Sequence, residues 1–264
     1  MAVTAPTGFV VDPQDPRAPP SEVWAKMTPA EQERVVASLP ADLPWELSPP
    51  EGDHHRQAKE AAVDVLDRFF RRAGRKVYVT SEIGVYYPAE PRFAPDVLAV
   101  LDVEPHERNT WIVDKEGKGL DFVLEVHVEG DFAKDYVRNV ERYARLGVTE
   151  YFLFDRARVH LFGFRLPASG RRVYERIVPQ LGLFESQVLG LSLALVDGKL
   201  RFLAGDAVLP QTAELLSRMG VMLDEVMSHK DDLERQLAEE RAAKEAAETK
   251  LAEALAELEK LKKS

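Results

Sequence analysis

The pattern of apolar and polar positions in the middle of the chain predicts a sheet with a crossover helix. Three runs have the length and the β-branched or aromatic content of buried strands, at residues 96–102, 121–128 and 149–155. Between the second and third runs, residues 133–146 repeat apolar side chains at helical spacing and stop before Gly147. Strand, helix, strand with the helix as the crossover predicts a mixed sheet in an α/β or α+β core.

Segments on either side of this core continue the same kinds of pattern. Residues 57–73 repeat apolar side chains at helical spacing and predict an amphipathic helix packed on the sheet. The run 76–87 is rich in β-branched and aromatic residues and predicts a strand, or a bulged pair of strands, broken by Gly84. After the central strands, the alternating positions of 158–166 and 172–178 predict a hairpin.

Proline content and residue type divide the chain into three parts. Residues 1–51 hold 10 of the 17 prolines and predict an irregular arm, in which a capping box at 28–31 opens a short helix. Residues 52–205 hold the predicted sheet and its helices, and we expect them to form one domain. Within 206–264 a helix begins near Thr212, and its second half lacks glycine and proline, which predicts a long C-terminal helix.

Two heptad positions of this C-terminal helix form a seam that is only partly apolar. One position holds Leu237, Lys244, Leu251 and Leu258, and the other holds Glu240, Ala247, Ala254 and Leu261. Strong two-stranded coiled coils carry apolar residues at both positions in nearly every heptad. Two interpretations stay open: a long solvated helix, and a weak coiled coil that joins two copies of the chain as a homodimer.

The composition is that of an ordinary soluble protein, and it narrows the chemistry. Of 264 residues, 45% are hydrophobic and 30% are charged, and no apolar run approaches the roughly 20 residues of a membrane helix. The N-terminus lacks a basic and apolar leader pattern, so we expect a cytoplasmic protein with no membrane partner. The chain has no cysteine, so any metal ion is expected to bind oxygen or imidazole ligands.

Charge is distributed unevenly along the chain. The formal net charge is −10, but residues 52–176 hold 21 acidic and 21 basic residues, so the excess acid lies in the flanks. A neutral centre permits phosphate binding without predicting it. The chain also lacks a glycine-rich phosphate loop, a Gly-x-Ser-x-Gly elbow and a His-Glu-x-x-His helix, which argues against nucleotide, serine-hydrolase and zinc-protease sites.

Two acidic residues stand in or beside the apolar strands. Asp96 opens the first predicted strand and Glu125 lies inside the second. A buried carboxylate costs free energy unless it is paired or bound to a metal. If the strands lie side by side, the two carboxylates could offer oxygen ligands to magnesium or manganese, which would polarise a phosphoryl oxygen. The alternative is a Pro-Asp turn and a satisfied buried acid.

Other polar residues are candidates for the same site. His127 follows Glu125 by two positions and shares its strand face, as a metal ligand, a general base or a structural histidine. Lys134 and Arg138 share a helix face that could reach a phosphate or an attacking water, or could face solvent. Three accessory candidates come from upstream segments: Glu82 on the preceding strand, and His55 and Glu60 on or before the first helix of the core.

Several short motifs together resemble a known family. They are Pro95-Asp96, Glu125-Val126-His127, Lys134-Asp135 and the run from Arg142 to Asp155. The most specific part is the pattern Tyr-Ala-x-Leu-Gly-Val-x-Glu-Tyr-x-x-x-Asp in the last run. In these motifs, residues from about 20 to 205 resemble the restriction endonuclease family sometimes called the Uma-two family, within the PD-(D/E)XK nuclease superfamily.

The resemblance implies a restriction-endonuclease-like fold, with a mixed central sheet flanked by helices, and metal-dependent hydrolysis of DNA. By implication Asp96 and Glu125 are magnesium ligands. In the superfamily pattern a lysine follows the second acid by two positions, where this chain has His127. The family often carries its basic residue on the following helix instead, at the position of Asn139, and Lys134 is therefore the candidate replacement.

Three functions are open on these grounds. The first is an endonuclease acting on DNA, in which Asp96 and Glu125 hold magnesium and Lys134 or His127 is the basic partner. The second is a catalytically inactive nuclease fold that binds protein or nucleic acid and associates through the C-terminal helix; the acidic total and the altered basic positions favour it. The third is a structural assembly protein built on the C-terminal coiled coil, which leaves the two acids unexplained.

Overall fold

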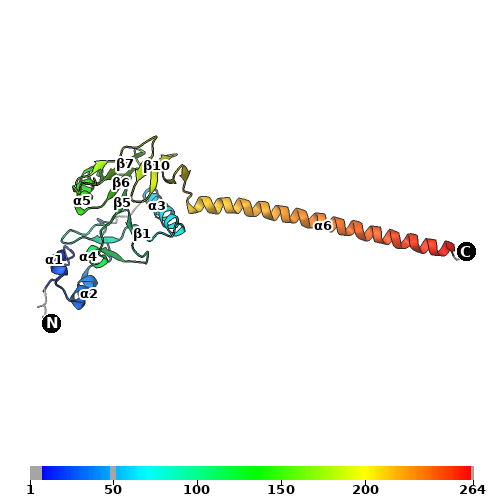
Figure 1. The fold of residues 1–264 in the computed structure, drawn as a ribbon, viewed down its shortest axis with the longest axis horizontal. Helices are drawn as coiled ribbons and strands as arrows, with labels where there is room; N and C mark the ends of the chain where they lie inside the picture. The colour runs from blue at the N-terminus through cyan, green and yellow to red at the C-terminus, as the bar shows by residue number, and fades with distance from the viewer. Residues whose placement is uncertain (1–7, 48–51, 263–264) are drawn as a thin grey trace. The chain divides into compact units, whose positions relative to one another are not determined.

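The chain forms two compact units, residues 1–211 and 212–264. A computed structural model describes residues 8–47 and 52–262, with side chains described as far as residue 256. The first unit holds all the strands and the short helices, and the second is one long helix, coloured yellow to red in Figure 1. Each unit is therefore described by itself.

Helices and strands alternate through the first unit. The helices are α1 (Ser21–Trp24), α2 (Pro29–Ser38), α3 (Asp53–Arg72), α4 (Val113–Glu116), the π-helical segment η1 (Lys134–Arg138) and α5 (Asn139–Leu146), and the second unit is α6 (Thr212–Lys262). The strands are β1 (Val77–Thr80), β2 (Gly84–Tyr86), β3 (Val97–Leu101), β4 (Thr110–Ile112), β5 (Phe122–His127), β6 (Glu150–Asp155), β7 (His160–Arg165), β8 (Glu175–Arg176), β9 (Phe184–Ser186), β10 (Leu191–Val196), β11 (Lys199–Ala204) and β12 (Ala207–Val208).

A six-stranded mixed sheet is the centre of the first unit. Its strand order is β1-β3-β5-β6-β7-β8, and β5 and β6 are the parallel pair while the other neighbours are antiparallel. Figure 1 shows β5, β6 and β7 side by side at its core. The parallel pair is joined by η1 and α5, as a parallel connection requires a crossover. This architecture confirms the predicted α/β fold with helices around a mixed central sheet.

The two faces of this sheet are covered by different elements. One face packs against apolar side chains of α3, such as Leu66 and Phe70, and against the four-stranded sheet β12-β11-β10-β9. The other face contacts α5 through Tyr143 and the β2-β4 pair through Trp111. Alternate residues of each central strand are therefore buried on opposite sides, and a polar residue in β5 lies under either α3 or α5.

Local structure differs from the sequence-based expectation in two places. The segment between the first two predicted central strands, for which the sequence pattern predicted no strand, contains β4, where Trp111 is buried and stacks on Tyr78 with ring centroids 5.4 Å apart. The expected hairpin partner of β7 shrinks to the two exposed residues of β8, which form the edge of the sheet. The first difference reflects the burial of Trp111 in β4. The second reflects the exposure of both residues of β8.

The described part of the N-terminal arm packs on the body of the first unit. The predicted capping box is confirmed, because Thr28 accepts a hydrogen bond from the backbone of Glu31 and the Glu31 carboxylate accepts one from the backbone of Thr28. Side chains before and within α2, including Met27, are buried against Tyr86 and Ile112 of the β2-β4 pair. The arm is packed more closely than its proline content predicts.

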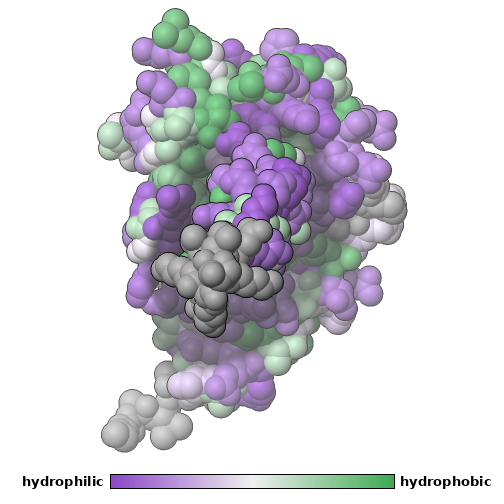
Figure 2. All heavy atoms as spheres, turned by 90° about the vertical axis from the view of Figure 1, so that its right-hand side faces the viewer, coloured by the Kyte–Doolittle hydropathy of each residue, from purple (hydrophilic) through white to green (hydrophobic). Residues whose placement is uncertain are grey.

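Within the described residues, no helix is long and apolar enough to cross a membrane. The face that Figure 2 presents is mostly hydrophilic, with apolar side chains gathered in smaller green areas.

Candidate active site

The register between β3 and β5 brings Asp96 and Glu125 together. Val97 pairs with Leu124 in the antiparallel ladder, so Asp96 stands opposite Glu125 one step further on. The backbone N–H of Val126 donates to Asp96 Oδ2 at 2.7 Å, and the backbone N–H of Asp96 lies 3.4 Å from Glu125 Oε2. The two acids share the α5 side of the sheet, since strand alternation puts Glu125 on the same face as Val123.

Glu125 is buried and lies among like charges. Tyr143 of α5 donates its hydroxyl to Glu125 Oε1 at 2.5 Å. Burial, followed by the negative charges of Asp96 and Asp135, raises the pKa of Glu125 well above its ordinary value, despite the hydrogen bond from Tyr143. The Tyr143 hydroxyl thus holds the Glu125 carboxyl group in place, but it carries no positive charge that would offset a negative charge there.

Asp96 has the opposite electrostatic balance. His55, at the start of α3, places Nε2 2.9 Å from Asp96 Oδ2. Burial alone raises the pKa of Asp96, but the hydrogen bond and charge of His55, the Val126 N–H and the charge of Lys59 together leave that pKa below its ordinary value. One acid of the pair therefore stays ionised more readily than the other, a division typical of catalytic carboxylates.

Lys59 is the residue of this site that the sequence reasoning missed. Its side chain is buried, and Nζ lies 2.6 Å from Oε1 of Glu82. Glu82 adopts a positive φ of 54°, a conformation that costs free energy for a residue other than glycine, and its N–H donates to the carbonyl of Pro95 at 3.0 Å. A sequence signal did exist, since Lys59 falls one turn after His55 on the apolar face of α3.

His127 contacts a second acid rather than the first pair. It lies buried on β5, and its Nδ1 is 3.1 Å from Oδ2 of Asp135 in η1. The other oxygen of Asp135 accepts from Asn139 Nδ2 at 3.2 Å. Burial raises the pKa of Asp135 although the bond to His127 opposes this. His127 and Asn139 therefore fix the orientation of Asp135, whose charge in turn acts on Glu125.

The remaining candidates lie on exposed surfaces. Lys134, the first residue of η1, is exposed, yet its positive charge lowers the pKa of both Glu125 and Asp135. Arg138 pairs with Asp131 at 2.6 Å, with both side chains largely in solvent. Glu60 is exposed on α3 and pairs with Arg56 at 2.8 Å. Of these three, Lys134 is the one whose charge acts on the acid pair.

The residues at this site fit a magnesium ion that is bound partly by water and substrate better than they fit an ion enclosed entirely by protein ligands. Among residues 8–47 and 52–262, no group of three or more His, Asp or Glu side chains forms a metal cluster. Magnesium is commonly bound through one or two carboxylates, with water and substrate phosphate as the other ligands. Two adjacent acids, one with a pKa raised by burial and then by its neighbours' negative charge, suit that mode of binding.

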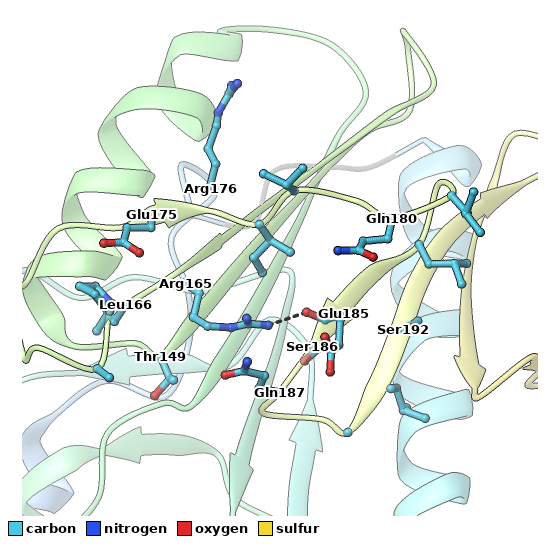
Figure 3. Close-up of a pocket in the computed structure, with 18 of the residues that line it drawn as sticks. Thr149, Arg165, Leu166, Glu175, Arg176, Gln180, Glu185, Ser186, Gln187 and Ser192 are labelled. Carbon is cyan, nitrogen blue, oxygen red and sulfur yellow. Dashed lines mark hydrogen bonds between the residues drawn. The ribbon is translucent and has the colours of Figure 1, made fainter.

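A cavity of about 1100 Å³ lies elsewhere and contains neither Asp96 nor Glu125 in its lining. Figure 3 shows it between β7 and the β9–β10 strands, with Arg165 donating to the carbonyl of Glu185. Arg165 Nε also lies 2.6 Å from the fully buried Glu150, whose carboxylate further accepts from the Ser186 hydroxyl and the Gln187 N–H. These bonds join the two sheets, so we assign this network a structural role.

The fold and the acid pair define a nuclease-like α/β protein, with two strand-borne carboxylates on one face of a mixed sheet. The sequence profile of the Uma2 family, described as "Putative restriction endonuclease", matches residues 28–196, and the chain belongs to this family. No curated protein matches the chain. A crystal structure described as that of "a putative nuclease belonging to DUF820" from Anabaena variabilis is 15% identical, covers 55% of this chain and 79% of its own, and has a TM-score of 0.42.

Proposed function

We propose that this protein is a metal-dependent endonuclease that hydrolyses phosphodiester bonds of DNA. The observation that carries the proposal is the pairing of Asp96 with the buried Glu125, whose pKa is raised by burial and by neighbouring negative charge. Two adjacent carboxylates repel each other and are costly to bury, whereas a bound cation would offset that repulsion. Membership of the nuclease family supports the same conclusion.

Asp96 and Glu125 would hold the ion, magnesium or manganese. When bound, such an ion polarises a phosphoryl oxygen and lowers the pKa of a coordinated water. Tyr143 and His55 orient the two carboxylates through the hydrogen bonds described above, which limits their rotamers before substrate arrives. Lys59, paired with Glu82, adds a buried positive charge beside Asp96.

The basic partner in this proposal is Lys134. It is exposed, so its ammonium is accessible to a phosphate, and its charge already acts on Glu125. Placed beside the scissile phosphate, it would stabilise the negative charge that develops there. His127, the other candidate, is buried and bonded to Asp135, and we assign it a positioning role in which it holds Asp135 next to the acid pair.

The direct experiment compares wild type with Asp96→Asn and Glu125→Gln. Both substitutions keep side-chain size and remove the charge. We expect each to reduce magnesium- or manganese-dependent nicking of supercoiled DNA by about 100-fold or more, the scale of losing one electrostatic stabiliser. Calorimetric titration with manganese should show binding by wild type and its loss in both variants.

The matched controls change one acidic and one basic residue that lie outside the site. Glu33→Gln on α2 and Lys115→Met on α4 should leave nicking unchanged, while Lys134→Met should lower it and Lys134→Arg should largely preserve it. Equal nicking by wild type and by both acid variants would assign the activity to a contaminant or a different site and would remove the proposal.

A second candidate function is a nuclease fold retained only for binding. The positions that commonly hold the basic residue carry His127 and Asn139, and both are engaged in holding Asp135. This candidate expects DNA binding without cleavage and no manganese binding between the acids. The calorimetric titration separates the two candidates directly, because a binding module has no need to hold a cation there.

The proposal includes a homodimer formed through α6. The helix is 51 residues long, and apolar side chains along it are exposed. A helix in a protein gains most of its stability by packing an apolar face against other residues. Two joined chains would bring two nuclease units into one assembly.

A further inference from the structure

The apolar stripe of α6 is longer than the C-terminal seam suggests. Counting back in heptads from Leu237 and Glu240, the same two positions hold apolar residues at the start of the helix. The large apolar members with described side chains are exposed by 47–66%: Leu216, Met219, Leu223, Val226, Leu233, Leu237 and Leu251. An apolar stripe of this length that faces solvent marks an interaction surface.

Three charged residues interrupt this stripe, and they limit what can cover it. Lys230 and Lys244 occupy one heptad position, and Glu240 occupies the other. A partner must offer opposite charge at those points, since like charges that face each other in an interface cost several kcal/mol. The chain itself carries such charges at complementary spacing, so a second copy fits the stripe.

Orientation decides whether the charges match. In a parallel, in-register pair each seam residue faces its own copy, so Lys230, Glu240 and Lys244 each meet a like charge. In an antiparallel pair the two heptad positions face each other instead. We propose that α6 forms an antiparallel two-stranded coiled coil with α6 of a second copy, in which Lys230 faces Glu240 of the partner subunit.

The same register matches the apolar layers along the helix. Residues that face each other then have numbers that sum to 470, as 230 and 240 do. Leu233 faces Leu237 of the partner subunit, Leu223 faces Ala247 of the partner subunit, Met219 faces Leu251 of the partner subunit, and Leu216 faces Ala254 of the partner subunit. Large residues thus oppose small or flexible ones in most layers, which permits close packing.

One layer of the proposed pair is mixed, and Lys244 has an acidic neighbour on its own helix. Lys244 faces Val226 of the partner subunit in this register. Its ammonium lies 4.0 Å from Glu248 of its own helix, at the flank of the stripe. The alkyl part of a lysine can cover an apolar neighbour while its charged end reaches outward. Charge pairing at Lys230 and Glu240 sets the register, and the Leu and Met layers supply the contact area.

The absence of cysteine from the chain permits a direct test on the full-length protein. Met219→Cys and Leu251→Cys are purified separately and oxidised alone or after mixing and re-equilibration. The antiparallel register predicts a disulfide-linked dimer only in the mixture. In that register residue 219 of the two copies lies about 48 Å apart, at 1.5 Å rise per residue over 32 residues, so neither variant should cross-link to itself.

Sedimentation equilibrium checks the pairing itself. We expect wild type to approach twice the chain mass of 29.7 kDa, and Leu233→Glu to weaken association at least tenfold. Ser228→Glu, at a position outside the stripe, is the matched control and should remain dimeric. A mass of one chain at all concentrations overturns the pairing, and self-cross-linking of either cysteine variant overturns the antiparallel orientation. Neither readout uses metal or DNA, so failure of the proposed nuclease activity would leave this result intact.

Discussion

The acid site of the first unit and the stripe of α6 both place residues in unfavourable surroundings, but in opposite ways. In the first unit, charged groups such as Glu125 and Lys59 are buried and held by partners from other segments of the same chain, Tyr143 and Glu82. In α6, apolar residues such as Leu223 and Leu233 face solvent. Both arrangements cost free energy: burying charge is unfavourable, and so is exposing apolar surface to water. In our proposals a bound cation offsets the first cost and a partner helix offsets the second.

The two regions therefore differ in whether a single chain supplies all the contacts that the proposals require. In the first unit, residues of one chain supply every component of the proposed site except the ion and the substrate. In the proposed dimer, the complement of the α6 stripe comes from a second copy of the chain. Substitutions in the two regions should therefore be read by different measurements: thermal unfolding and metal titration for the first unit, and mass and cross-linking for α6.

The largest loss of stability is expected at the polar network that joins the two sheets. Glu150→Ala removes a fully buried carboxylate and leaves Arg165 and the Ser186 hydroxyl without their shared acceptor. Breaking a buried ion pair of this kind costs about 3–5 kcal/mol. Chemical denaturation should show the loss, and a matched exposed variant, Glu175→Ala, should unfold like wild type. A loss below about 1 kcal/mol would remove the structural role assigned to this network.

A leucine pair sharpens the contrast between the two units. Leu124→Ala on β5 creates a cavity in the core and should destabilise the first unit by about 3 kcal/mol. Leu237→Ala removes the same atoms from the stripe and should leave unfolding of the first unit unchanged while it weakens dimerisation. Thermal unfolding and sedimentation of both variants give the comparison. If Leu237→Ala also unfolds the first unit, the two regions are energetically coupled and the contrast fails.

The raised pKa of Glu125 predicts a pH-dependent penalty in the first unit. A carboxyl group with a folded-state pKa above its unfolded value binds protons more readily when folded, so folding is favoured at low pH. That contribution is lost as pH rises from the ordinary glutamate range through the folded pKa. Glu125→Gln should remove this loss and melt at a higher temperature than wild type near pH 7, without metal. Identical pH profiles of melting for wild type and Glu125→Gln would contradict the shift.

The smallest effect is expected from Tyr143→Phe. It deletes the hydroxyl that donates to Glu125 and leaves the ring in the core, so we expect a loss of about 1–2 kcal/mol at neutral pH. The loss should shrink at low pH, where Glu125 is protonated. A companion variant, Tyr174→Phe, removes a hydroxyl bonded to the carbonyl of Val148 and should show no such pH dependence. Equal pH dependence in both variants would separate Tyr143 from the acid site.

Much of the central architecture follows from sequence pattern. The apolar runs and the helix before Gly147 predict strands, crossover and mixed sheet, because burial on both faces requires continuous apolar strands. The Tyr-Ala-x-Leu-Gly-Val motif also acquires a physical reason in the structure. Its tyrosine, Tyr143, holds Glu125, and its glutamate, Glu150, ties β6 to the end of β9 through Ser186.

Details of the site depend on contacts between distant segments, and sequence pattern does not contain them. Lys59 is the one lysine of the amphipathic helix α3, and the sequence does not show that it is buried beside Glu82 in the fold. His127 shares a strand face with Glu125, as expected, but its ring nitrogen turns to Asp135. The direction of such side chains is decided by which donors and charges surround them after packing.

By itself the sequence determined the mixed sheet, the two acids on neighbouring strands, the long C-terminal helix and the heptad spacing along it, because each depends on local periodicity. Only the tertiary structure decided that Asp96 and Glu125 are adjacent, that their pKa values move in opposite directions, and that His55 and Lys59 come from α3 to the same place. The physical reason is that hydrogen bonds, burial and charge interactions act over a few ångströms in space, whatever the separation of the residues along the chain.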